Sequence, residues 1–294
     1  MSVEMQNMLQ ELKKTSIKVS DISSQYWCEK QMELRYRFGE KITKEIRKGK
    51  AIHEALEDEV NVPVMLEPRN YADFMYKSLY TSWLSLSSLV EKKRGREIQI
   101  YGSINGYKLV GRIDQLQMED GRVVLLDDKT TASPKKPSDS QLNSNRVQLM
   151  IYRKMLEDIC SGAYAEANFT MSYGIDRLEM SKEFLMQLRA IGVPDELHNF
   201  RSITGAFFLK YRSIGSLSNT VRIRYIDQST REEIGLYSFE YSNTAAQEII
   251  TYVLKYWNKE REASPVPESE KWKCNRCVFF GNECKAWWPQ KTVV

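Results

Sequence analysis

Two acids and a lysine lie close together in one stretch, residues 107–130, and their types and spacing could support chemistry. Asp114 ends a segment that alternates apolar and polar side chains, and Asp127 and Lys129 follow an apolar, β-branched run. Side chains two residues apart on a strand lie on the same face, so Lys129 is expected on the same face as Asp127. Carboxylates brought together repel each other unless a cation lies between them, and Mg²⁺ prefers oxygen ligands. The set therefore fits metal-assisted phosphodiester cleavage, in which the lysine activates water or stabilises charge on the phosphate.

Two turn signals place these residues on neighbouring strands. Asp120-Gly121 joins the two halves of the stretch, and Asn105-Gly106 joins its first half to an earlier strand at 97–101. Glycine accepts the positive φ that two-residue hairpin turns need. The sequence therefore predicts a three-stranded antiparallel meander that brings the two acids together.

Three more side chains could join the acids. His53 lies within a predicted helix, and Gln148 and Tyr152 lie four residues apart in another, so these two share a helix face. A lone histidine on a helix is more often structural than a ligand. The chemical role of His53 therefore depends on what the fold brings next to it.

The remaining elements predict an α/β fold. Apolar periodicity and capping residues predict helices over 40–60, 71–90, 145–159 and 182–191, and one from Ser242 or Asn243 to about 262. Residues 91–96 read as a solvated basic connection. Short strands are predicted near 168–174, 207–212, 221–226 and 234–240.

Composition bounds the class of protein. The chain has 294 residues, of which 42% are hydrophobic and 28% are charged, a normal globular balance. It contains no apolar run long enough to span a membrane. The N-terminus resembles neither a secretory signal nor a good mitochondrial presequence. The net charge of +4 permits a polyanionic partner without requiring one.

Five cysteines are too few and too unevenly spread for a disulfide framework. Cys274, Cys277 and Cys284 lie close together near the C-terminus, with a spacing typical of metal ligands in a reducing compartment. Either Cys28 or Cys160 could supply a fourth sulfur. Cys28 is favoured because it lies among aromatic and charged residues, whereas Cys160 ends an apolar helix. From the residues alone, zinc and a [4Fe–4S] cluster are both possible.

In combination, these motifs resemble the iron–sulfur branch of the PD-(D/E)XK nucleases, with a RecB-type core. The order and length most resemble the exonuclease V family. The resemblance covers about residues 19–288 and rests on Gly49-x3-His53, Gly111-Arg-Ile-Asp114, Asp127-Asp-Lys129, Gln148-x3-Tyr152, the segment 19–28, and Cys-x2-Cys-x6-Cys-x2-Trp287. One departure is that the first acid of the third motif is more often Glu than Asp.

The resemblance implies roles at the matching positions. Mg²⁺ or Mn²⁺ would be held by His53, Asp114 and Asp127, with the Asp128 carbonyl assisting and its carboxylate as a rival ligand. Lys129 would orient or activate the water and stabilise charge on the phosphate, positioned by Gln148 and Tyr152. The [4Fe–4S] cluster would be held by Cys28, Cys274, Cys277 and Cys284 and would act as a staple between the chain ends.

We therefore expect one nuclease domain over 1–294 with a PD-(D/E)XK core. Its expected parts are a helical part with the first cluster cysteine (20–60), a catalytic core (97–175), a strand-rich part (176–240), and a C-terminal helix with the iron–sulfur region (242–288). The resemblance implies a metal-dependent exodeoxyribonuclease that prefers single-stranded DNA and acts in DNA repair or replication.

Two alternatives stay open at this point. One is a restriction-like endonuclease of the CRISPR-adaptation kind, which would share every motif. The other is a non-catalytic DNA-binding or scaffold protein stabilised by zinc. The expected partners are single-stranded DNA and, as a candidate, a single-strand-binding protein, with no membrane. A monomer in the nucleus or cytoplasm is expected.

Overall fold

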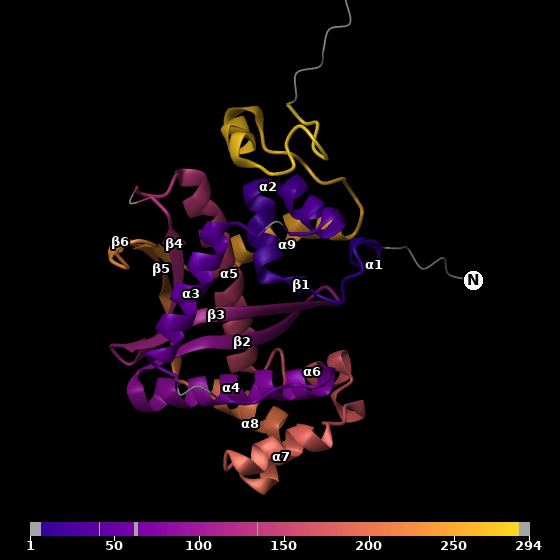
Figure 1. The fold of residues 1–294 in the computed structure, drawn as a ribbon, viewed down its shortest axis with the longest axis vertical. Coiled ribbons are helices and arrows are strands. Elements are labelled where there is room, and N and C mark those ends of the chain that lie inside the picture. Colours follow the sequence, from indigo (N-terminus) through magenta and orange to yellow (C-terminus); the bar gives the residue numbers. More distant parts are fainter. Residues whose placement is uncertain (1–6, 41, 62–63, 134, 288–294) are drawn as a thin grey trace, which may run out of the picture.

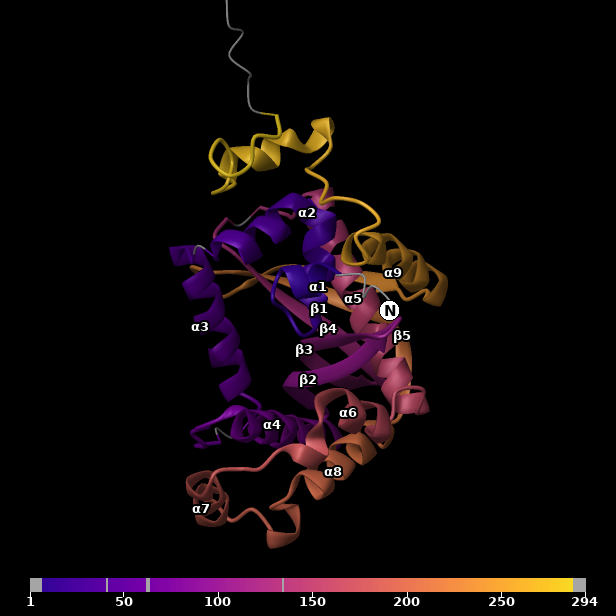
Figure 2. The same ribbon diagram turned by 90° about the vertical axis from the view of Figure 1, so that its right-hand side faces the viewer.

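A mixed sheet flanked by helices forms the centre of the chain (Figure 1, Figure 2). The computed structural model describes residues 7–40, 42–61, 64–133 and 135–287. Within these ranges the six strands are β1 (Ile17–Lys18), β2 (Arg94–Ile104), β3 (Tyr107–Glu119), β4 (Arg122–Thr131), β5 (Ser216–Asp227) and β6 (Glu233–Glu240). The helices are α1 (Met8–Glu11), α2 (Val19–Phe38), α3 (Lys44–Asp58), α4 (Tyr71–Lys92), α5 (Asp139–Ser161), α6 (Glu166–Tyr173), α7 (Lys182–Ala190), α8 (Phe200–Arg212) and α9 (Asn243–Trp257).

Strand β3 is central because other strands pair with both of its edges. Strand β2 runs antiparallel to it along one edge. The other edge is shared, since β1 pairs in parallel with residues 109–110 and β4 pairs antiparallel with residues 115–119. Strand β5 follows β4 in parallel, and β6 is antiparallel to β5. The expected mixed sheet flanked by helices, with an antiparallel meander of β2, β3 and β4, is confirmed.

Both predicted hairpin turns form, and each fixes the register of its strands. Asn105 and Gly106 have φ of 45° and 84°, and Asp120 and Gly121 have φ of 46° and 75°. Positive φ at both central residues is the type I′ geometry, whose twist matches that of the flanking strands. Each turn has two residues, so pairing starts directly at the residues that flank it, and the position of every later residue follows.

Helix α5 is the main helix behind the sheet. Ser138 and Gln141 form a capping box at its start, and Gly162 ends it with φ of 83°. The helix packs against α2, α8 and α9 and against strands β2, β4 and β5. Contacts on so many sides explain why its buried positions are not confined to one stripe.

The outer edge of β2 is covered rather than left open. Gln99 N donates a hydrogen bond to Ser82 Oγ of α4 (2.9 Å), and Gln99 O accepts one from Tyr211 Oη of α8 (2.7 Å). Side chains thus satisfy backbone groups that no strand pairs with, which protects an edge that could otherwise recruit another chain.

Two predicted strands are wrong: residues 168–174 lie largely in α6, and residues 207–212 form the end of α8. Phe207, Phe208 and Tyr211 have high β propensity, but all three are buried and Asn199 caps the helix. These residues form a helix despite their β propensity, because tertiary packing that buries aromatic side chains outweighs the propensity of single residues. The predicted basic connection is also partly wrong, since Arg96 lies in β2 and is buried.

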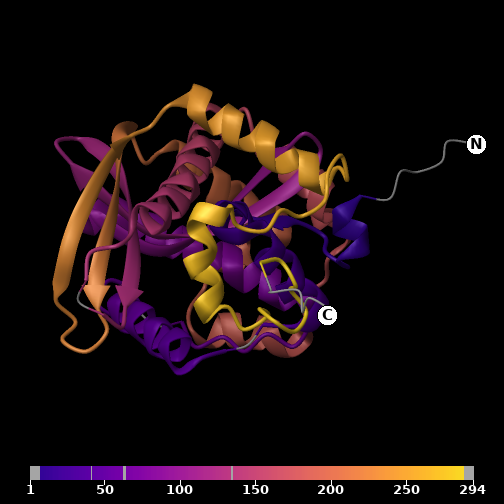
Figure 3. The same cartoon turned by 90° about the horizontal axis from the view of Figure 1, so that it is seen from above.

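The C-terminal segment lies across the N-terminal helix α2, as Figure 3 shows from above. The segment contains the 3-10 helix η3 (Glu268–Arg276), from which Lys273 Nζ donates a hydrogen bond to Trp27 O of α2 (3.1 Å). The expected domain parts stay predictions, and residues 1–6 and 288–294 lie outside the described residues. No described helix is both long and apolar enough to cross a lipid bilayer.

Candidate active site and cysteine cluster

Three acids lie side by side on three neighbouring strands. The pairs Arg96↔Gln115 and Ile98↔Ile113 leave Glu97 of β2 opposite Asp114 of β3. The register of the second hairpin, which reaches Gln115↔Leu126, leaves Asp127 of β4 opposite Asp114 on the other side. Residues opposite each other in antiparallel strands share a face. Sequence reasoning missed Glu97, although the register that the Asn105-Gly106 turn sets would have found it.

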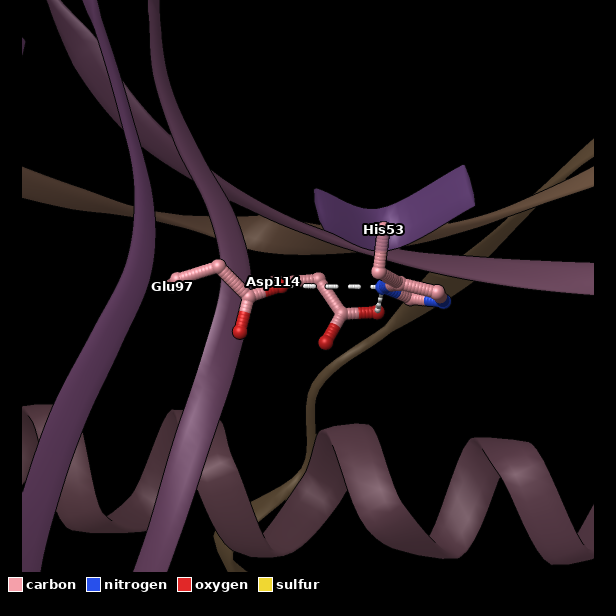
Figure 4. A group of neighbouring side chains, drawn as sticks. All are labelled: His53, Glu97 and Asp114. Carbon is pink, nitrogen blue, oxygen red and sulfur yellow. Dashed lines mark ion pairs between the residues drawn. The ribbon is translucent and has the colours of Figure 1, made fainter. Parts of the chain in front are cut away.

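His53 of α3 lies over the first two of these acids (Figure 4). Its Nδ1 is 3.6 Å from Glu97 Oε1 and 3.8 Å from Asp114 Oδ2, and ligand atoms of the three residues lie within 4.8 Å of one another. Burial opposes protonation of His53, but the hydrogen bond to Glu97 and the charge of Asp114 outweigh it and raise its pKa. The group offers one nitrogen and several oxygens to a cation.

A glycine allows α3 to bring the histidine this close. A Cβ at Gly49 would lie 2.7 Å from Thr130 Oγ1 on β4, so a larger residue would push the helix away. Figure 2 shows α3 standing beside the sheet rather than packed among the other helices. A cavity of about 670 Å³ separates it from the strands and is lined by residues that include His53, Glu97 and Asp114.

Asp127, Lys129 and Gln148 form a second group beside Asp114. Lys129 Nζ is 2.8 Å from Asp127 Oδ2 and donates a hydrogen bond to Gln148 Oε1 (3.1 Å). Gln148 Nε2 donates in turn to Asp127 Oδ1 (3.2 Å). Burial opposes the charge on Lys129, but the carboxylates of Asp127 and Asp114 outweigh it and raise its pKa. The lysine is thus held by its neighbours on both sides.

Asp114 lies where the β3–β4 ladder ends. Its Oδ2 accepts a hydrogen bond from the backbone N–H of Asp128 (2.8 Å). This part of the β3 edge lies between the residues that pair with β1 and those that pair with β4, and the Asp114 side chain lines the cavity beneath α3. Burial and the charge of Asp127 raise the pKa of Asp114 to about 7. A cation at this position would offset both effects.

Asp128 points to the opposite face and is not available as a rival ligand. Arg96 Nη2 is 2.6 Å from its Oδ2 and Arg224 Nε is 2.7 Å from its Oδ1, and the carboxylate is 0% exposed. Burial would raise its pKa, but the two guanidinium groups outweigh burial and lower it. This buried network fixes the end of β4, from which Asp127 and Lys129 extend toward the other face.

Tyr152 packs against the backbone of β3 rather than against the lysine. Its Oη accepts a hydrogen bond from Arg112 N (3.2 Å). A Cβ at Gly111 would lie 2.4 Å from the Tyr152 ring, so only glycine fits there. Burial raises the pKa of Tyr152, which keeps the hydroxyl neutral. The structure thus brings Gln148 to Lys129, whereas Tyr152 helps to place the strand that carries Asp114.

Glu97 has a strained backbone, with φ of 52°. Residues other than glycine rarely adopt this left-handed region, and such strain is concentrated at functional sites. We interpret the strained backbone as a sign that the orientation of the Glu97 carboxylate is important for the function of this site.

The four predicted cluster cysteines line one small pocket, and Cys160 does not. The pocket is formed by α2 and the C-terminal segment and contains Cys28, Cys274, Cys277 and Cys284. Cys28 lies at a kink that interrupts α2, with φ of −167° and ψ of 105°. Burial raises the pKa of Cys28, and so do the nearby Cys277 and Cys284. Cys160 instead donates its thiol to Tyr211 O (3.3 Å).

Comparisons with known proteins found one matching family and several similar chains. The family model described as exonuclease V, a 5′ deoxyribonuclease, matches residues 6–122, 117–206 and 202–288. Exonuclease V from Danio rerio is 22% identical over 283 residues, which are 92% of this chain and 70% of that protein. Two crystal structures are similar at 12% identity: SSO0001 (TM-score 0.42, 92% of this chain and 90% of that one), and a candidate exonuclease from Eubacterium rectale (TM-score 0.38, 91% and 90%).

The family match spans almost the whole described chain, in three consecutive parts. The expected enzyme class, an exodeoxyribonuclease, is therefore confirmed. The chain belongs to the exonuclease V family.

Proposed function

We propose that this chain is a metal-dependent exonuclease that digests single-stranded DNA from the 5′ end during DNA repair or replication. The observation that carries the proposal is the row of Glu97, Asp114 and Asp127 on one face, with His53 at one end and Lys129 at the other. The family description, a 5′ deoxyribonuclease, supports the polarity. A single-strand-binding protein as partner, a monomeric state and a nuclear or cytoplasmic location stay predictions.

The donor set fits a divalent metal such as Mg²⁺ or Mn²⁺. Asp114 is common to both groups, with His53 and Glu97 on one side and Asp127 on the other. Oxygen-rich donors of this kind suit hard divalent cations. A bound cation would polarise the phosphate and lower the pKa of an attacking water. We propose His53, Glu97, Asp114 and Asp127 as the residues that hold it.

The remaining residues position the reacting groups. Water attacks phosphorus and loses a proton to solvent, the bond from phosphorus to the leaving oxygen breaks, and that oxygen takes up a proton. Lys129 presents its ammonium group beside Asp127, where it would stabilise the charge that develops on the phosphate. Gln148 contacts both Lys129 and Asp127, so it restricts the lysine to this position. The PD-(D/E)XK assignment implied by the motifs agrees with these roles.

The cysteine pocket fits a [4Fe–4S] cluster better than a single zinc ion. Four sulfurs bound to one tetrahedral zinc would be about 3.8 Å apart, given a Zn–S distance of about 2.3 Å. Among the described residues, no three of these sulfurs lie within 4.8 Å of one another. In a [4Fe–4S] cubane each cysteine binds a different iron, so the cysteine sulfurs lie farther apart than they do around a single zinc ion. We propose that the cluster joins α2 to the C-terminal segment.

A cleavage assay with the full chain tests the function. Single-stranded DNA labelled at either end should be digested with Mg²⁺ and left intact with a chelator. Digestion should require a free 5′ end, so a circular single strand should stay intact. Cleavage of the circle would instead support the endonuclease alternative, and a lack of metal-dependent digestion would support the non-catalytic one.

We expect Glu97→Gln to weaken Mn²⁺ binding by about 10–100-fold, as loss of a group that supports a metal typically does. The variant keeps the size of the side chain and removes its charge. Binding is measured by calorimetry without DNA, so the result does not depend on activity. Glu54→Gln is the matched control, because Glu54 lines the same cavity outside the ligand group. Equal affinities of parent and Glu97→Gln would remove Glu97 from the metal site.

A further inference from the structure

A second cavity adjoins the active site on the other side of Lys129. It has a volume of about 390 Å³ and is bounded by α2, the end of β4, the segment after it, the start of α5 and β5. Lys129 and Thr130 line both this cavity and the larger one beneath α3. A linkage that reacts at Lys129 would therefore belong to a strand that reaches both cavities.

The two cavities differ sharply in charge. The cavity beneath α3 is lined by acidic residues that outnumber its basic ones, since Glu45, Glu54, Glu57, Glu97 and Asp114 face Lys50, Arg112 and Lys129. The second cavity has no Asp or Glu among its described lining residues and has three cations, Arg35, Lys129 and Lys135. Phosphates are repelled by the first cavity except where a metal ion neutralises it, and they are attracted by the second.

Arg35 is available to a ligand. It lies half-buried on α2, and its Nη2 donates a hydrogen bond to Ser24 Oγ (2.9 Å). Among the described residues, no carboxylate lies within 4.0 Å of the charged groups of Arg35 or Lys135, although many other basic residues of the chain have such partners. A planar guanidinium that is already oriented by one hydrogen bond suits bidentate contact with a phosphate.

The rest of the lining is polar and aromatic. Asn145 Nδ2 donates a hydrogen bond to Tyr225 Oη (2.6 Å), and Tyr225 pairs in register with Lys129. Trp27 and Gln31 of α2 line this cavity and also the cysteine pocket, where Gln31 Nε2 is 3.4 Å from Cys277 Sγ. Such a lining suits sugar, phosphate and base together, and 390 Å³ is in the range of pockets that hold one small ligand.

We infer that this second cavity binds the sugar–phosphate backbone of the single DNA strand next to the linkage that is cut, and that Arg35 contacts one of its phosphates. The inference rests on the proposed function and adds the place and the charge contact by which the strand is held. The volume of about 390 Å³ is of a size to hold one nucleotide, so we expect the cavity to hold a single strand.

The test measures the affinity of the full chain, with its cluster intact, for single-stranded DNA in the presence of a chelator. Arg35→Gln should lower the affinity and reduce the slope of log K against log salt by about 0.7, the value for one phosphate contact on a single strand. Arg35→Lys should restore most of the slope. Arg201→Gln, at an exposed site on α8, is the matched control and should leave both quantities unchanged.

A neutral linkage distinguishes contact with DNA from a role in folding. Oligonucleotides with a single methylphosphonate at successive positions lose one charge each. At one position near the cut site, the methylphosphonate should lower the affinity of the parent for the oligonucleotide but leave the affinity of Arg35→Gln unchanged. If the parent and the variant respond alike at every position, or if their salt slopes are equal, the inference is wrong. A parent that binds DNA without cleaving it would contradict the proposed function alone.

Discussion

Replacing Asp114 with asparagine is expected to lower the rate of DNA cleavage by about 10²–10³-fold or more, the usual effect of removing one group that stabilises a transition state. Asp114 lies between the His53–Glu97 group and Asp127, so its loss would weaken both sides of the metal site. DNA affinity should not fall, because the variant removes a negative charge near the phosphates. Single-turnover kinetics measure the cleavage rate, and binding of single-stranded DNA in the presence of a chelator measures the affinity separately.

The same variant should not destabilise the protein. Asparagine can still accept the hydrogen bond from Asp128 N. Burial and the charge of Asp127 raise the pKa of Asp114 to about 7, so ionisation costs the folded state stability as the pH rises from about 4 toward 7. At pH 8 with a chelator, the variant should melt at or above the temperature of the parent. Asp176→Asn, at an exposed site, serves as the control. Cleavage at the parent rate would contradict the assigned active site.

Replacing Cys277 with serine is expected to remove the metal cluster. The purified chain should lose its brown colour and about four irons per molecule, the content of one [4Fe–4S] cluster. Without this link, the segment that contains η3 should become more sensitive to protease, because it would be held on α2 only by non-covalent contacts such as the Lys273–Trp27 hydrogen bond and the Trp27–Trp272 ring contact. Affinity for single-stranded DNA should fall as well, since Trp27 and Gln31 line both the cysteine pocket and the basic cavity.

Cys160→Ser is the matched control for this experiment. Cys160 is the one cysteine of the chain outside the pocket, and its thiol contacts Tyr211 O instead. Burial raises the pKa of the Cys160 thiol to about 11. The control should keep its iron. Zinc in place of iron in the parent, or equal loss of iron from both variants, would contradict the cluster assignment.

The core of the site follows from local sequence. The turns Asn105-Gly106 and Asp120-Gly121 fix both registers, and period-two alternation separates Asp127 from Asp128. The meander and the facing acids could therefore be predicted without knowledge of the rest of the fold. Glu97, the first residue of the strand predicted at 97–101, was equally determined by the register, but its carboxylate was given no role.

Other features depended on long-range packing. The aromatic residues of α8 suggested a strand, since β propensity reflects a half-buried surface and cannot distinguish it from a buried helix face. Arg96 looked like a solvated cation, and only the carboxylate of Asp128 on β4, together with the side-chain oxygen of Gln115 on β3, made burial of its charge favourable.

The hairpins, the acids and lysine they carry, and the cysteine spacing are local features, and the order of the motifs indicated the family. The approach of α3 to β4 at Gly49, which brings His53 to Glu97 and Asp114, and the placement of Cys28 beside the C-terminal cysteines became visible only in the folded chain. Turns and alternation act between neighbours along the chain, whereas the docking of a helix depends on which surfaces remain to be buried once every other element is in place.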